Sequence, residues 1–232
     1  MYRHWEITKD LYKEQLKWSL WLIIGVTIIR YILLGFYHVI GFEPEDLGHL
    51  LSMSIEPTKI FMLIIGLLSV YVFLTFFVQT GITRKEYYYG TAYSAIGLAI
   101  TIPLIFLALF GIEGLFVLAT PLELGYSHIS FSGLVTELIA YILAILFYFV
   151  IGWFITSGFY RYGWLKGLGF IFTSILIVMI NGAFWGEDIE IFELSINFGD
   201  IPFILSATLT IVLTLILMRV NRILTRDIKI KM

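Results

Sequence analysis

Long apolar blocks alternate with short polar clusters along the whole chain. Six blocks are long enough to cross a bilayer, which takes about 20 residues of helix, and none has the alternate-residue pattern of a barrel strand. Because unpaired backbone polar groups are costly in hydrocarbon, the blocks predict helices. We therefore expect an all-α membrane protein, with one transmembrane domain over residues 1–232. The expected spans are residues 18–41, 59–80, 91–112, 133–157, 165–185 and 201–219.

Composition supports the same class. Apolar and aromatic residues (AVILMFWYC) make up 59% of the chain and charged residues 14%, with a mean hydropathy of +0.93, whereas soluble domains are about a quarter charged. The first block is too long for the core of a signal peptide and precedes no small-residue cleavage site, so we expect it to be retained. The absence of cysteine excludes disulfides and thiolate metal sites.

Charged residues are unevenly divided among the connections. Thirteen of the fifteen lysines and arginines lie before the first block, in the second and fourth connections, and after the last block. The first, third and fifth connections are acidic instead. By the positive-inside rule, this pattern predicts that both termini are cytoplasmic. The acidic residues are Glu43, Glu45, Asp46, Glu56, Glu113, Glu123, Glu187, Asp188, Glu190, Glu193 and Asp200.

Residues 1–17, before the first block, have a helical pattern. Aromatic and aliphatic side chains share one face, and lysines recur every four residues on another. The pattern predicts either an amphipathic helix lying in the membrane interface or a solvated helical lead-in to the first span. The two faces consist of Trp5, Tyr12 and Leu16, and of Lys9, Lys13 and Lys17.

One arginine lies inside the first block. Arg30 is about twelve residues from the start of that block, roughly 18 Å along a helix, so we expect it at mid-bilayer. A charge there costs on the order of 3 kcal/mol, so it should face protein, a carboxylate or trapped water. Glu137 in the fourth block is the nearest expected partner by depth. Arg30 then either locks the bundle or handles substrate.

Small polar residues form a further pattern in the last two blocks. Ser206, Thr210 and Thr214 share one face of the last block, and Asn181 lies in the fifth. These side chains either line a substrate path or hydrogen-bond the preceding turn and a neighbouring helix.

The stretch GITRKEYYYG, residues 81–90, interrupts the apolar pattern between the second and third blocks. Gly81 stands where a helix end needs a left-handed residue, and Thr83 with Glu86 has the spacing of a capping box. We expect a helix that begins at Thr83 in the cytoplasm and ends after about two turns, where Gly90 interrupts it. The residues alone leave open a positively charged tight loop.

Residues 78–97, VQTGITRKEYYYGTAYSAIG, resemble the connection between the second and third spans of ABC-2 type transporter permeases. In that family a glycine, a Ser/Thr-Arg-Lys/Arg run and an aromatic cluster form a coupling helix. The six spans, the cytoplasmic ends and the amphipathic start are also similar to the family. The chain lacks the large extracellular domain of many drug exporters. It also lacks a clear signature in residues 186–200, where such permeases often carry extracellular or re-entrant helices.

The resemblance implies a permease domain in a bacterial cytoplasmic membrane, similar to compact permeases of Gram-positive bacteria that export peptides or confer resistance to them. It implies export of a peptide or another amphipathic substrate, a separate ABC ATPase as energy source, and a second permease copy or paralogue as partner in the bilayer. The residues that it assigns to coupling are Thr83, Arg84, Lys85, Glu86, Tyr87 and Tyr88. The candidates for a substrate path are Arg30, Glu137, Asn181, Ser206, Thr210 and Thr214.

Other function classes fit less well. All four histidines precede the fourth block, so Ser157 has no later histidine to act as its base, and no HExxH motif is present. A secondary transporter would need acidic residues near the midplane, where Glu137 is the candidate. A substrate-capturing subunit of a vitamin importer would not need a charged cytosolic helix. No P-loop motif occurs, so ATP hydrolysis is expected in a partner. We expect no catalytic residue, cofactor, metal site or nucleic-acid partner.

Overall fold

A computed structural model describes residues 3–40, 48–119, 130–187, 189–191, 194–196, 199 and 201–226. Six helical segments in these ranges are long and apolar enough to cross a membrane, which confirms the predicted multi-pass membrane protein. They are α1 (Arg3–Ile40), α2 (Leu50–Leu68) continued by η2 (Ser69–Leu74) and α3 (Thr75–Gln79), α4 (Arg84–Ala119), α5 (Phe131–Tyr162), α6 (Trp164–Phe184) and α7 (Phe203–Arg226).

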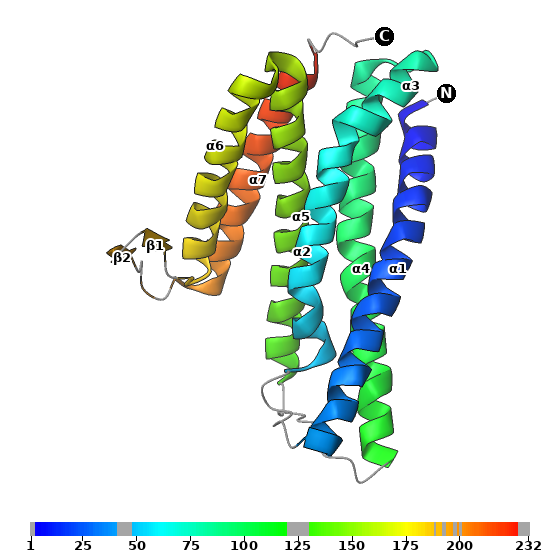
Figure 1. The fold of residues 1–232 in the computed structure, drawn as a ribbon, viewed down its shortest axis with the longest axis vertical. Helices are drawn as coiled ribbons and strands as arrows, with labels where there is room; N and C mark the ends of the chain where they lie inside the picture. The colour runs from blue at the N-terminus through cyan, green and yellow to red at the C-terminus, as the bar shows by residue number, and fades with distance from the viewer. Residues whose placement is uncertain are drawn as a thin grey trace.

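The helices form one bundle in which α1, α2, α4 and α5 stand side by side and α6 with α7 packs against α5 (Figure 1). Helix α1 lies along α4, and α2 lies along α5. The pair α6 and α7 is shorter, so the first turns of α5 project beyond it (Figure 1). The start of α1, the start of α4 and the end of α7 lie at the same end of the bundle.

Helices α2 and α5 touch through their backbones. A Cβ atom on Gly66 would come 2.1 Å from the carbonyl oxygen of Phe149, and one on Gly152 would come 2.2 Å from the carbonyl oxygen of Leu63. No larger residue fits at either position without separating the helices. This contact fixes the crossing of α2 and α5, in the way that small residues bring membrane helices together.

The second span contains an irregular turn. Between α2 and α3 the chain widens into the π-helix η2, where main-chain hydrogen bonding departs from the α pattern. The carbonyl oxygen of Ser69 in η2 accepts a hydrogen bond from the hydroxyl of Tyr87 in α4. The irregular turn therefore joins the second span to the start of the third.

The helices extend beyond the apolar blocks, because helical hydrogen bonding continues through the polar residues at the block ends. Helix α4 is continuous through Gly90, so the prediction of a separate two-turn helix ending there is wrong. Gly90 instead allows α1 to approach: a Cβ atom would lie 2.7 Å from Cγ2 of Ile7. The hydroxyl of Thr8 donates to the Gly90 carbonyl at 3.3 Å.

Helix α1 is also continuous, so residues 3–17 form no separate interfacial helix. Ile7, Leu11 and Gln15 of this part are buried, whereas the lysine face is exposed. The buried face of this part therefore packs on α4, whereas Trp5 of the predicted apolar face is 54% exposed.

The fifth connection contains a short hairpin where re-entrant helices are typical of the resembled family. Strands β1 (Ile189–Ile191) and β2 (Leu194–Ile196) pair antiparallel, with Ile191 opposite Leu194. Several predicted outer acidic residues lie outside the described residues, so their surroundings stay predictions. They are Glu43, Glu45, Asp46, Glu123, Asp188, Glu193 and Asp200.

Candidate functional site

The second and third spans are joined by a tight turn closed by main-chain hydrogen bonds. Gly81 has φ +83°, which confirms the predicted left-handed glycine. Its amide donates to the carbonyl of Val78 at 3.0 Å, and the amide of Ile82 donates to that of Phe77 at 3.1 Å. This pair of bonds is the Schellman arrangement, which ends a helix and satisfies its last carbonyls.

The predicted capping box is present on the other side of the turn. The amide and hydroxyl of Thr83 donate to Oε2 of Glu86 at 3.0 Å and 2.7 Å, and the amide of Glu86 donates to the Thr83 hydroxyl at 3.2 Å. The box satisfies amides that a helix start leaves unpaired. Helix α4 therefore begins where the sequence predicted a helix.

The two tyrosines expected at a partner surface are buried inside the bundle. Tyr87 is fully buried, and Tyr88 is 8% exposed. The Tyr88 hydroxyl donates to the carbonyl of Met218 in α7 at 2.9 Å, and its ring lies 5.1 Å from that of Trp153 in α5. The expected outward contact by Tyr87 and Tyr88 is thus wrong, because this side of α4 faces its own neighbours. The exposed side chains of the turn include Thr83 and Lys85.

Arginines join the end of α7 to the helices beside it. Nη1 of Arg84 donates to the carbonyl of Arg226 at 3.2 Å, and Nη1 of Arg161 donates to that of Ile223 at 3.0 Å. The guanidinium of Arg222 lies 5.0 Å from the centroid of a tyrosine ring of α4. Cations are favourable at a helix C-terminus, where carbonyls are left unpaired. The start of α4 is therefore bonded to both η2 and α7.

Arg30 pairs with Glu113 of α4. Its Nε donates to Oε1 of Glu113 at 2.8 Å, and the two side chains are 1% and 2% exposed. Its Nη1 donates to the carbonyl of Gly48, just before α2, at 3.0 Å. The expected partner, Glu137, was wrong because the sequence prediction ended the third span at residue 112. Helix α4 continues and carries Glu113 beside Arg30.

Glu137 pairs with His49 instead. Oε2 of Glu137 lies 3.2 Å from Nε2 of His49, while Nδ1 of His49 accepts a hydrogen bond from the amide of Ser52 at 3.2 Å and caps α2. In a neutral ring this arrangement leaves the proton on Nε2, facing Glu137. Burial, assisted by the nearby Arg30 charge, lowers the pKa of His49 below its ordinary value of 6.5.

The predicted polar stripe of the last two spans lies between α6 and α7. The hydroxyl of Thr210 accepts a hydrogen bond from Nε1 of Trp185 at 3.0 Å and donates to Oδ1 of Asn181 at 2.9 Å. Ser206 donates to the last carbonyl of α6, and Thr214 donates to the Thr210 carbonyl at 2.7 Å. Asn181, Ser206 and Thr210 therefore link the two helices, whereas Thr214 bonds the preceding turn of its own helix.

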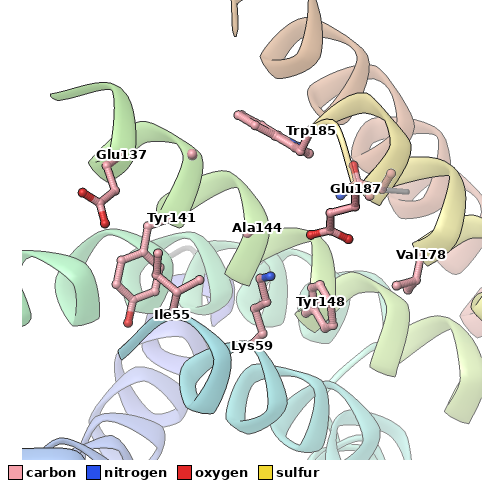
Figure 2. A pocket seen from close by; sticks show the side chains of 12 residues that line it. Ile55, Lys59, Glu137, Tyr141, Ala144, Tyr148, Val178, Trp185 and Glu187 are labelled. Carbon is pink, nitrogen blue, oxygen red and sulfur yellow. The ribbon is translucent and has the colours of Figure 1, made fainter. Parts of the chain in front are cut away.

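A cavity of about 140 Å³ lies between α2, α5 and α6 and borders on Asn181. One water molecule needs only about 15 Å³. Figure 2 shows Lys59 and Glu187 pointing toward the space between these helices, with Glu137 at one end. The rings of Tyr148 and Trp185 also line it.

Two details set the charge of this cavity. Nζ of Lys59 lies 2.5 Å from Oε1 of Glu56 and 5.6 Å from the ring centroid of Tyr148, so its charge is already balanced. The carboxylate of Glu187 lies over Gly182, where a Cβ atom would come within 2.4 Å of Oε2. Gly182 thereby leaves room for a carboxylate at the cavity wall.

Sequence reasoning missed Lys59, Glu187 and Glu113. Lys59 stood at the edge of an apolar block, and both glutamates counted as members of outer acidic connections. Helix α2 begins at Leu50, nine residues before Lys59. Because the sequence prediction began this span at residue 59, it did not reveal that Lys59 lies inside a helix. The position of Glu187 beside the cavity depends on the turn after α6 and has no sequence signal.

Comparison of this chain with models of protein families, with curated proteins and with solved structures finds no match.

Proposed function

We propose that this chain is the membrane subunit of an ATP-driven exporter of the ABC-2 type, and that a separate ATPase acts on the turn between α3 and α4. The observation that carries the proposal is the rigid, capped turn that exposes Thr83 and Lys85 at one end of the bundle. Because hydrogen bonds close the turn on both sides, a movement of the ATPase would displace the turn and the attached helices without first deforming the turn.

The contacts around the turn support this role. The hydroxyl of Tyr87 is bonded to η2, that of Tyr88 to α7, and Arg84 to the end of α7. A displacement of the turn therefore acts on the second, third and sixth spans together. Such rigid movement of packed helices is how hinge and shear transitions open or close a binding site.

Burial of the tyrosines changes which residues meet the partner in this proposal. The ATPase contacts Thr83 and Lys85, while Glu86 holds the turn in shape and Tyr87 with Tyr88 passes its movement on. The substrate is a peptide or another amphipathic molecule, and a second permease copy completes the transporter. Both ends of the chain lie in the cytoplasm of a bacterium, the side of the ATPase.

Affinity purification tests the proposal. The tagged wild-type chain is purified in a mild detergent together with the ATPase encoded nearest its gene, and the ratio of the two proteins is measured. We expect a stable complex, and we expect Lys85→Glu to lower the recovered ATPase about tenfold by reversing a charge at the contact.

The matched control is Lys166→Glu. Lys166 is an exposed lysine at the start of α6, near the same end of the bundle but away from the turn. The Lys166→Glu substitution makes the same change of charge as Lys85→Glu and should leave the complex with the ATPase intact. Equal recovery of ATPase with the wild-type and Lys85→Glu chains would remove the turn from the contact.

A secondary transporter is the second candidate, because a specific observation favours it. Glu113 is a buried carboxylate inside α4, and Glu137 is a second carboxylate inside α5. Carboxylates inside transmembrane helices are used for proton coupling in transporters. In that case transport by the chain alone would stop when a protonophore collapses the proton gradient, and would proceed without ATP.

A further inference from the structure

We propose that the cavity between α2, α5 and α6 binds a positively charged ammonium group, and that the transported substrate carries one. The first half concerns the purified chain alone. The second half deepens the proposed export function and rests on it.

The balance of charge around the cavity favours a cation. Lys59 is neutralised by Glu56, which is 72% exposed while Lys59 is 14% exposed. Glu187 and Glu137 remain, and the histidine beside Glu137 is held neutral at neutral pH because burial lowers its pKa. Two carboxylates therefore border the cavity, the exposed Glu187 and the partly exposed Glu137, and both attract a cation.

The aromatic lining suits the same ligand. Tyr148 and Trp185 border the cavity, and a cation is attracted to the face of such rings. Lys59 already demonstrates this, because its ammonium nitrogen lies 5.6 Å from the Tyr148 centroid. Aromatic walls with a carboxylate are the arrangement that proteins use for alkylated ammonium groups.

The carboxylate of Glu187 borders the cavity, although this residue is exposed. Any side chain at position 182 would displace Oε2 of Glu187, so Gly182 keeps that carboxylate at the wall. Lys59 points to the same space, and among the described ion pairs its partner is Glu56 rather than Glu187 (Figure 2).

Three probes of similar shape test the charge that is recognised. Choline carries a trimethylammonium group, 3,3-dimethylbutan-1-ol is its uncharged isostere, and glycine betaine adds a carboxylate. Binding of radiolabelled choline to the full-length chain in an uncharged maltoside detergent is measured by equilibrium dialysis, with the other two as competitors. We expect saturable choline binding, no competition by the alcohol, and at least about tenfold weaker competition by betaine.

Two variants with opposite expected effects keep the test sharp. Glu187→Gln removes an attractive charge and should weaken choline binding about tenfold or more. Lys59→Met leaves the Glu56 carboxylate without its counter-charge, which makes the cavity more negative, and should tighten choline binding. Glu14→Gln, on the exposed face of α1, changes a carboxylate far from the cavity and should have no effect. A thermal scan of each variant shows that it is folded.

The ammonium group can belong to a free cation or to a lipid head group, and competition separates these sources. Stronger displacement of bound label by choline than by a short-chain phosphatidylcholine indicates a free cation, whereas much stronger displacement by the phosphatidylcholine indicates a head group. Absence of saturable choline binding, competition by the alcohol equal to that by choline, or weaker binding to Lys59→Met would overturn the proposal. None of these results bears on the ATPase complex, so the exporter function can stand or fall separately.

Discussion

Replacement of Arg30 by methionine should strongly destabilise the bundle, because it leaves a buried carboxylate without its counter-charge. Arg30 and Glu113 are 1% and 2% exposed, and Arg30 also bonds the carbonyl of Gly48. Methionine fills a similar volume without a charge or a donor. In this variant Glu113 keeps its desolvation cost and loses its partner.

The expected magnitude follows from that burial. Breaking a buried ion pair from one side costs about 3–5 kcal/mol, whereas replacing both partners by apolar residues is often close to neutral. The other oxygen of Glu113, Oε2, has no hydrogen-bond partner among the described residues, so nothing else compensates the loss. We therefore expect Arg30→Met to lose several kcal/mol and Arg30→Met with Glu113→Leu to recover most of it.

The assay is a double-mutant cycle on unfolding in mixed detergent micelles, followed by tryptophan fluorescence. A matched control is the exposed ion pair of Lys17 and Glu14 on the same helix, with a distance of 2.7 Å and exposures of 67% and 54%. Lys17→Met should change stability by less than about 1 kcal/mol. Strictly additive effects of the Arg30 and Glu113 substitutions would refute the reasoning, since they would mean that the two side chains do not interact.

Further expectations concern packing, pH and orientation. Gly66→Ala should destabilise the bundle and lower the midpoint of thermal unfolding. Gly25→Ala should not, because nothing lies within 4 Å of the new Cβ atom. Equal midpoints for the two variants would contradict the close contact of α2 and α5. Burial lowers the pKa of His49 below 6.5, so the contribution of His49 to stability is present above that pH and is lost as the pH falls through the lowered value. The variant His49→Asn keeps the helix cap and should reduce the loss of thermal stability between about pH 7.5 and about pH 5. An unchanged pH profile of this variant would argue against the role of His49. As the chain has no cysteine, a thiol at Glu45 should react with an impermeant reagent on intact cells and one at Lys85 should not; the reverse would invert the topology.

The sequence predicted the spans well because their signal is local. An apolar run of about 20 residues and a capping box are both read from neighbouring residues. The start of α4 at the Thr83 cap is an example. The ends of the helices were less accurate, because polar residues at a helix end can be satisfied by another helix, as Glu113 is by Arg30.

The candidate site depended more on tertiary contacts. No pattern within the sequence reveals that Tyr87 faces η2, or that Gly90 serves the approach of α1 rather than the end of a helix. The cavity combines Lys59 and Glu187 from segments far apart in the chain. Such pairs become visible only when the packing of the helices is known.

We propose that an ATPase is coupled to this chain through the turn between α3 and α4. The most direct measurement is the rate of ATP hydrolysis by the ATPase alone and with the chain in lipid nanodiscs. We predict a several-fold change of rate with the wild-type chain and with Lys166→Glu, and loss of this change with Lys85→Glu. An identical rate in the presence and absence of the wild-type chain would contradict the account.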